Sequence, residues 1–300
     1  MRKVYDCFMF YNEFDILEVR LSELYDHVDH FVITEANTTH ADNPKPYYFL
    51  ENIDRFKPFL DKIIHIKVED MPGIQPGQPD KSDCFFNDKH QRNCILRGLT
   101  DANDDDVIIV SDCDEIPRGT VIDFIRNDYS HDIWGFRMPC FHFRYNYMWT
   151  DPLQHTLQNL AATKRKLLTY PSPTDARWFA LQRPFQRPEG WDANGELVIN
   201  HAGWHFTSMG DDKHVANKMK EFAHLEFRHL ADSYDVEGQI AKNAGPIGLE
   251  HHCKKVEPVI LDEYFPKVLY QNQDKWAKNI LTTGQKTVLD HLGHISFTVR

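Results

Sequence analysis

The first 112 residues alternate predicted strands with predicted helices, and this alternation restricts the fold more than any other feature of the sequence. Residues 12–28 and 87–102 carry apolar side chains at helical spacing. Four segments rich in β-branched and aromatic residues flank these helices. The predicted strands are residues 3–10, 30–37, 62–68 and 106–112. This order predicts an α/β fold with a mostly parallel central sheet, in which ligands bind beyond the carboxyl ends of the strands.

The second half of the chain is less regular. Residues 134–149 are aromatic and roughly alternating, which predicts one or two strands. Residues 196–206 are predicted to form a strand that leads into a turn, and residues 211–230 a helix. Residues 71–83 contain several proline and glycine residues, which predicts a mobile loop.

Composition excludes several classes of protein. The 300 residues carry a formal net charge of −11, which argues against a nucleic-acid-binding protein because such a protein needs basic surface for phosphates. The longest apolar runs are shorter than a membrane span, so no transmembrane segment is expected. The six cysteines form no CxxC pair, which predicts reduced thiols and a cytoplasmic location.

The fourth predicted strand ends in a concentration of acidic residues. The segment VIIVSDCDEIP, residues 107–117, leads from a buried strand directly into Asp112, Asp114 and Glu115. Two neighbouring carboxylates repel each other unless a cation lies between them, and oxygen ligands of this kind suit Mg²⁺ or Mn²⁺. The sequence therefore predicts a metal and nucleotide site here. The alternative is a solvated acidic turn before a helix that begins at Pro117.

Several segments together resemble glycosyltransferase family 17, a family with the GT-A (Rossmann-like) fold. The resemblance is carried by residues 6–49, by QRNCILRGL (91–99), by DDDVIIVSDCDEIPRG (104–119) and by NHAGWHFTSMG with KMKEFAHLEF (200–227). It implies an inverting, metal-dependent transfer of a sugar, GlcNAc from UDP-GlcNAc, to a hydroxyl of a glycan or polysaccharide. It also implies Mn²⁺ or Mg²⁺ as the cofactor and a UDP-sugar as the donor.

The resemblance divides the expected single domain, residues 1–300, into three parts. Residues 1–120 form the nucleotide-binding half, residues 121–230 the acceptor half, and residues 231–300 a C-terminal helical extension. The sequence lacks the membrane anchor and stem of the animal enzymes, so we expect a different acceptor from theirs. A lipid-linked or surface polysaccharide, reached by peripheral contact with a membrane, is the acceptor that we expect.

The resemblance also suggests roles for individual residues. The metal ligands are predicted to be Asp112, Asp114 and His205, and His201 is the alternative to His205. Glu115 is expected either to support these ligands from behind or to begin a helix. The nucleotide is expected to contact the ends of the first two strands, the helix before the acidic segment and the first acid of the pair. These predicted nucleotide contacts are Asn12, Glu13, Glu35, Arg92, Asn93 and Asp112. Asn12 has the alternative role of a helix cap, and Arg92 that of a partner for Asp112.

The catalytic base is not determined by the sequence. Inverting transfer needs a carboxylate to accept the proton of the attacking hydroxyl. Asp212 is preferred and Glu189 follows, while Asp211 and Glu226 remain alternatives. Two other functions stay open, namely a catalytically silent carbohydrate- or nucleotide-binding protein and a metal-dependent nucleotidyltransferase or phosphohydrolase.

Overall fold

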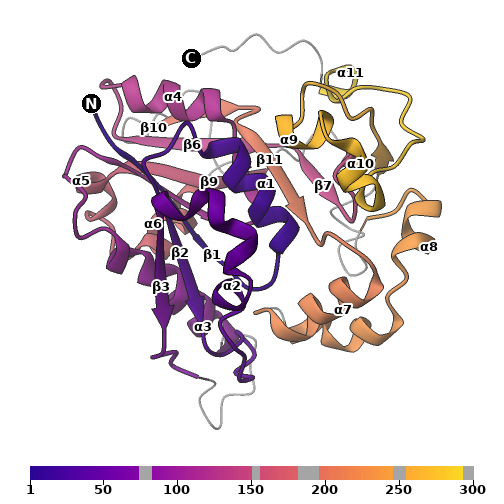
Figure 1. Ribbon diagram of the computed structural model, residues 1–300, viewed down its shortest axis with the longest axis horizontal. Helices are drawn as coiled ribbons and strands as arrows, with labels where there is room; N and C mark the ends of the chain where they lie inside the picture. The colour runs from indigo at the N-terminus through magenta and orange to yellow at the C-terminus, as the bar shows by residue number, and fades with distance from the viewer. Residues whose placement is uncertain (74–82, 151–155, 182–195, 224, 246–254, 293–300) are drawn as a thin grey trace.

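A computed structural model describes residues 1–73, 83–150, 156–181, 196–223, 225–245 and 255–292 of the chain. Its centre is a seven-stranded sheet with the order β10-β6-β9-β4-β1-β2-β3 (Figure 1). The four strands from the first half run parallel to one another, and β9 is antiparallel to both of its neighbours. The strands are β1 (Val4–Met9), β2 (His30–Ala36), β3 (Ile63–Val68), β4 (Val107–Asp112), β6 (Ile133–Met138), β9 (Thr156–Thr163) and β10 (Glu196–Asn200). The predicted α/β class with a mostly parallel central sheet is confirmed.

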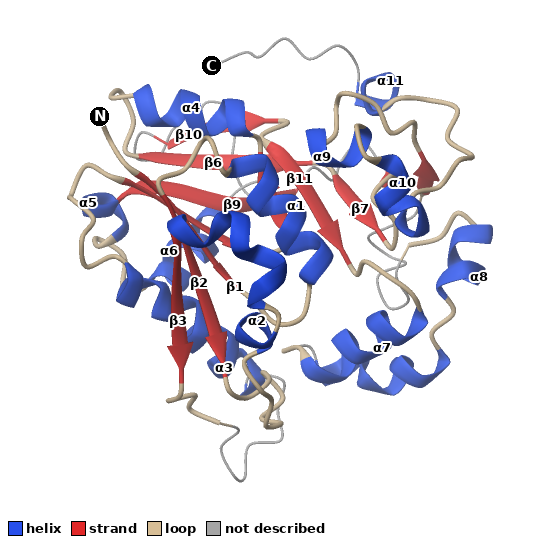
Figure 2. Cartoon of the chain, in the orientation of Figure 1, coloured by secondary structure: helices blue, strands red, loops and turns tan. Residues whose placement is uncertain are grey.

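Helices cover both faces of this sheet (Figure 2), which explains why β4 is apolar at consecutive positions. Val107 and Ile109 pack with α1 and α4 in one apolar cluster, whereas Ile108 and Val110 pack on the other face with η2 and α6. The covering helices are α1 (Phe14–Leu24), α2 (Tyr48–Glu51), η1 (Ile53–Lys62), α3 (Asp83–Asn93), η2 (Cys94–Gly98), α4 (Gly119–Asn127), α5 (Lys164–Leu167) and α6 (Pro173–Leu181).

A second, five-stranded sheet has the order β12-β8-β7-β11-β5. Its strands are β5 (Glu115–Pro117), β7 (Cys140–His142), β8 (Tyr147–Trp149), β11 (Gly203–Thr207) and β12 (Val256–Pro258). The remaining helices follow β11 along the chain. They are α7 (Asp212–Glu221), η3 (Leu225–Ser233), α8 (Val236–Ala241), α9 (Lys267–Tyr270), α10 (Gln273–Trp276), η4 (Ala277–Asn279) and α11 (Val288–Leu292). The predicted C-terminal extension thus contains short helices together with β12, which pairs with β8.

Several predicted boundaries were wrong for local reasons. Residues 196–206 form two strands, because His201 adopts a left-handed backbone conformation (φ 54°) that separates β10 from β11. Residues 134–149 form three strands instead of one or two. The helix expected at Pro117 begins at Gly119, because residues 115–117 pair with β11 as β5. The helix expected over 211–230 ends at Glu221, where Phe222 becomes extended.

Three further sequence predictions concern a loop, the cysteines and membrane-spanning segments. The loop predicted at 71–83 lies mostly outside the described residues. The described cysteines Cys7, Cys94, Cys113 and Cys140 are buried and form no disulfide with one another. Among the described residues, no helix has the length and apolar character that crossing a bilayer requires.

Gly203 sets the close approach of β11 to β5, and this gives a testable prediction. A Cβ atom at this position would lie 2.0 Å from the backbone oxygen of Ile116, which cannot move away without breaking the ladder. We expect Gly203→Ala to lower the free energy of unfolding by about 1–3 kcal/mol. Urea unfolding followed by circular dichroism measures this loss, and an unchanged midpoint would show that the two strands are not held this tightly.

Candidate active site

The acidic turn between β4 and β5 is held by a buried arginine. The Arg20 guanidinium donates to the backbone oxygens of Asp112 (2.8 Å), Cys113 (3.2 Å) and Glu115 (2.8 Å). Arg20 also forms an ion pair with Asp6, with 2.5 Å between Nη2 and Oδ1, and both side chains are fully buried. One arginine from α1 therefore fixes the backbone on which the acidic side chains stand.

Asp112 is paired with two arginines. Arg92 Nη2 lies 3.0 Å from its Oδ1, and Arg177 donates to its Oδ2 at 2.8 Å. Burial alone would raise the pKa of Asp112, but Arg177 and Arg92 hold this pKa well below its ordinary value. Glu115 accepts hydrogen bonds from Arg177 and from the Asp112 backbone N–H, both at 2.7 Å. Burial beside other acids raises the pKa of Glu115 to about 8. Asp112 is thus held as a charged partner of guanidinium groups.

Asp114 faces different groups. Lys218 Nζ from α7 donates to its Oδ2 at 3.0 Å, and His205 Nε2 lies 3.7 Å from its Oδ1. The antiparallel register of β11 with β5, which pairs His205 with Glu115, brings the histidine next to Asp114. Burial lowers the pKa of His205, so its imidazole is neutral near pH 7 and able to act as a metal ligand.

The predicted metal ligands fit a divalent cation in part. Asp114 and His205 are near neighbours and offer one oxygen and one nitrogen, a set that suits Mn²⁺ when substrate phosphates complete the coordination. Asp112 does not fit, because arginine N–H groups occupy both of its oxygens. His201 is directed elsewhere, since its Nδ1 lies 2.9 Å from Tyr264 Oη.

One other group of potential metal ligands occurs among the described residues. Asp70, His90 and Cys94 present ligand atoms within 4.8 Å of one another. Arg97 already holds both carboxylate oxygens of Asp70, at 2.9 and 2.7 Å. Asp70 is therefore held in ion pairs with Arg97 and His90, and this group of residues adds nothing to the acidic turn.

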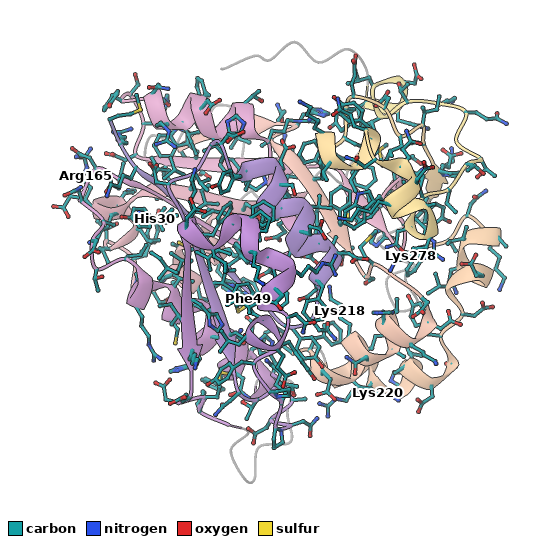
Figure 3. The ribbon with its side chains drawn as sticks, viewed as in Figure 1. His30, Phe49, Arg165, Lys218, Lys220 and Lys278 are labelled. Carbon is teal, nitrogen blue, oxygen red and sulfur yellow. The ribbon has the colours of Figure 1, made fainter. Side chains whose placement is uncertain are left out.

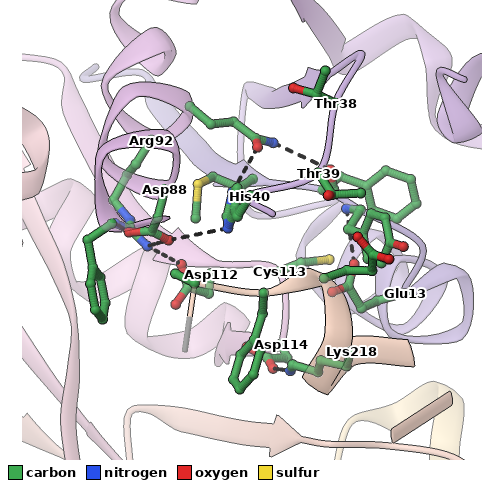
Figure 4. Close-up of a pocket in the computed structure, with 18 of the residues that line it drawn as sticks. Glu13, Thr38, Thr39, His40, Asp88, Arg92, Asp112, Cys113, Asp114 and Lys218 are labelled. Carbon is green, nitrogen blue, oxygen red and sulfur yellow. Dashed lines mark hydrogen bonds and ion pairs between the residues drawn. The ribbon is translucent and has the colours of Figure 1, made fainter. Parts of the chain in front are cut away.

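A cavity of about 360 Å³ opens over the acidic turn (Figure 4). We call it the first cavity. It lies at the carboxyl ends of β1, β2 and β4, where a parallel sheet is expected to bind its ligand. Its charged lining consists of four basic side chains, Lys45, Arg92, Arg177 and Lys218, and five acidic ones, Glu13, Asp88, Asp112, Asp114 and Glu221.

A second cavity of about 400 Å³ shares Glu13, Asp114 and Lys218 with the first. Its other walls come from α1, η1, the segments after β7 and β11, α7 and η4. Figure 3 shows Lys218 of α7 and Lys278 of η4, two of its lining residues that are distant in the sequence. The two cavities therefore meet at the Asp114–Lys218 pair.

The structure brings some of the predicted nucleotide contacts to these cavities. Arg92 and Asp112 line the first cavity, Asn12 lines the second, and Glu13 lines both. Asn12 is not the helix cap, because α1 is preceded by Glu13, whose carboxylate accepts from the backbone N–H groups of Tyr11 and Asn12.

Two predicted nucleotide contacts lie elsewhere. Glu35 lines neither cavity, because its fully buried carboxylate is held by Lys45, His65 and the backbone N–H of Phe49. Asn93 also lines neither cavity, since its side-chain oxygen accepts from the N–H and hydroxyl of Thr174. Glu35 and Asn93 therefore have structural roles in this fold.

The preferred base is also not at the site. Asp212 lines neither cavity, and its carboxylate accepts from the backbone N–H of Val236 instead. Glu189 and the Glu226 side chain lie outside the described residues. Asp211 lines the second cavity as the N-cap of α7, paired with His214 at 2.7 Å.

Sequence reasoning missed three residues that organise the site: Arg20, Arg177 and Lys218. Each comes from a helix that is distant in the sequence from the acidic turn. Arg177 lies 62 positions from its partner Glu115, and Lys218 lies 104 positions from its partner Asp114. A buried position in the amphipathic pattern of α1 was the available signal for Arg20. No local pattern marks Arg177 or Lys218 as partners of these acids.

The family model described as glycosyltransferase family 17 matches residues 1–154, about half of the chain. The chain belongs to glycosyltransferase family 17. This membership confirms the predicted family and enzyme class, and it agrees with the α/β architecture described above.

Named relatives agree with this assignment. The chain is 25% identical over 303 aligned residues to the human beta-1,4-mannosyl-glycoprotein 4-beta-N-acetylglucosaminyltransferase, which covers 92% of this chain and 54% of the human protein. It is 31% identical over 160 residues to the protein of the same name from Rattus norvegicus, covering 50% of this chain and 28% of the rat protein. The chain thus spans about half the length of the human relative, and its aligned part spans 28% of the rat protein.

Solved structures show more distant likeness. HddC from Yersinia pseudotuberculosis matches with a TM-score of 0.38 and 13% identity, over 67% of this chain and 92% of that one. Glucosyl-3-phosphoglycerate synthase from Mycobacterium tuberculosis, solved with Mn²⁺ and UDP-glucose, matches with a TM-score of 0.35 and 15% identity. This second match covers 67% of this chain and 70% of that one.

Proposed function

We propose that this protein is an inverting glycosyltransferase that moves GlcNAc from UDP-GlcNAc to a glycan hydroxyl with the help of Mn²⁺ or Mg²⁺. The observation that carries the proposal is the Asp114–Lys218 pair, which lines the strand-end cavity, together with His205, which lies next to Asp114 but does not line the cavity. The donor sugar is suggested by the activity in the names of the human and rat relatives.

The charge of the first cavity supports a nucleoside diphosphate bound with a divalent cation. Most of its basic side chains are already paired, including Arg92 and Arg177 with Asp112 and Lys218 with Asp114. A diphosphate that entered this acid-rich lining alone would be repelled, and a divalent cation offsets that repulsion. Asp114 and His205 would hold the cation, which would stabilise negative charge on the departing diphosphate.

The far end of the cavity suits a nucleoside. Thr38 and Thr39 follow β2, and the side-chain oxygen of Thr38 is buried without a hydrogen-bond partner among the described residues. Gln91 fixes the wall by donating to the Thr34 backbone oxygen at 2.9 Å. Trp178, 43% exposed, lines the same cavity and offers an aromatic face for a base or sugar ring.

Within this proposal, Lys218 has a direct role in the reaction. Asp114 raises the pKa of Lys218 above its ordinary value in spite of burial, so the ammonium stays charged. A positive charge at the junction of the cavities would stabilise the phosphate oxygen that leaves the anomeric carbon. Arg92 and Arg177 keep Asp112 ionised and fixed, and so they shape the wall next to Asp114.

The first test is release of UDP from UDP-GlcNAc in the presence of Mn²⁺, of Mg²⁺ and of EDTA, beside a panel of other nucleotide-sugars. We expect release with a divalent cation and a loss of at least tenfold in EDTA, because the acidic lining needs the cation to accept a diphosphate. Binding of UDP-GlcNAc without turnover would indicate a silent binding protein. Release of pyrophosphate or phosphate instead of UDP would indicate a nucleotidyltransferase or a phosphohydrolase.

A further inference from the structure

The second cavity has the features of a binding site for a neutral saccharide. Its charged lining is balanced, with four basic side chains, Arg55, Arg144, Lys218 and Lys278, and four acidic ones, Glu13, Asp15, Asp114 and Asp211. Sugar hydroxyls both donate and accept hydrogen bonds, so they match a lining that offers both donors and acceptors. Its volume of about 400 Å³ lies within the range of about 300–1,000 Å³ that small-molecule sites occupy.

The walls of this cavity are prearranged by internal ion pairs. Arg55 bonds to Asp15 at 2.6 Å and to Glu18 at 2.8 Å, and Lys278 lies 3.2 Å from Asp15. Phe14, which is half-buried, contributes apolar surface, which suits the face of a sugar ring. A ligand with a net charge would have to compete with these pairs, whereas a neutral ligand would not.

Glu13 occupies the place in this arrangement that a catalytic base needs. It lines both cavities, as do Asp114 and Lys218. Its Oε2 is fixed by the N–H groups of Tyr11 and Asn12, both at 3.1 Å. Its Oε1 has no hydrogen bond from any of the described residues, so one oxygen is available to accept a proton.

We propose that the second cavity binds the acceptor as a neutral saccharide and that Glu13 is the catalytic base. This inference rests on the proposed function, because it needs a sugar donor in the first cavity. The acceptor hydroxyl oxygen forms a bond to the anomeric carbon while the bond from that carbon to the phosphate oxygen breaks. The hydroxyl proton passes to Glu13 Oε1, and the nucleoside diphosphate leaves with the electron pair.

The test uses UDP-GlcNAc with Mn²⁺ and a panel of neutral and sulfated p-nitrophenyl glycosides that includes the β-mannoside. Glu13→Gln is expected to lower kcat for transfer to the best acceptor by about 10²–10⁴-fold, the usual contribution of a general base. UDP affinity, measured by calorimetry, should change less than about threefold, since the amide keeps the shape of the side chain. Asp212→Asn is the matched control, because Asp212 lines neither cavity.

A second variant tests the cavity independently of the base. His214 lines only the second cavity, and its side chain is 66% exposed, so His214→Trp fills space without disturbing the core. We expect a rise of at least tenfold in KM for the acceptor, with unchanged UDP affinity. Faster transfer to sulfated than to neutral glycosides would overturn the inferred acceptor class.

The outcomes separate the two proposals. If the parent protein uses UDP-GlcNAc but Glu13→Gln and His214→Trp transfer sugar like the parent, the second-cavity inference is overturned and the proposed function stands. If Asp211→Asn abolishes transfer while Glu13→Gln does not, the base is assigned wrongly. If the parent neither binds nor turns over any nucleotide-sugar, the proposed function itself fails.

Discussion

Asp114→Asn is expected to reduce the turnover of UDP-GlcNAc by about 10²–10³-fold, the cost of removing one preorganised electrostatic group from a transition state. This loss corresponds to about 3–4 kcal/mol of activation free energy. The amide has no negative charge to offer a cation, and it leaves Lys218 without its ionic partner. UDP release at saturating donor concentration measures the effect, and calorimetric titration with Mn²⁺ should show weakened metal binding.

The matched control is Asp123→Asn, which removes an exposed carboxylate on α4 that is paired with His27. We expect turnover within about twofold of the parent, because exposed pairs of this kind contribute little. Mn²⁺-dependent turnover at the parental rate in Asp114→Asn would contradict both the ligand assignment and the role of the Asp114–Lys218 pair.

Arg20→Leu is expected to have the largest effect on stability. It leaves the Asp6 carboxylate buried without its partner, and breaking a buried pair in this way costs about 3–5 kcal/mol. The backbone oxygens of Asp112, Cys113 and Glu115 lose their donor at the same time. Urea unfolding measures the change in stability, and turnover of the folded fraction should also fall.

Two further variants make this prediction specific. The double variant Arg20→Met with Asp6→Leu removes both charges and should recover part of the stability but not the turnover, since the acidic turn stays unsupported. Arg165→Leu, at an exposed ion pair at the edge of the molecule (Figure 3), should cost less than about 1 kcal/mol. Equal losses from Arg20→Leu and Arg165→Leu would show that the buried pair has no special role.

Local pattern was sufficient for the parallel strands and for the position of the acidic turn. Apolar runs such as residues 107–110 are buried on both faces, and the chain after them must emerge at the ligand-binding edge. Glu13 was predicted at this edge as a nucleotide contact because it follows the first strand, and it lines both cavities. These features depend on a few neighbouring residues, and so the sequence is enough to predict them.

The partners of the two acids could not be predicted, because they depend on contacts between distant segments. Asp112 and Asp114 lie two positions apart in the sequence, yet Arg177 of α6 pairs with the first and Lys218 of α7 with the second. Glu35 was assigned to the nucleotide because its own segment gives no sign of His65, which lies 30 positions away and holds it in the core. The two strands within residues 196–206 were missed because the left-handed conformation of His201 has no local signature.

The closing wall of the second cavity has a consequence for biosynthesis. Lys275 bonds to Glu18 across 257 positions of the chain, and the neighbouring Lys278 lies against Asp15. At about 5–20 residues per second, a ribosome makes these partners roughly 13–50 s apart. All residues that line the first cavity are synthesised before Lys275. The nascent chain can therefore form the first cavity while the second still lacks the wall that η4 provides. The second cavity is complete only after Lys278 and Asn279 have been synthesised.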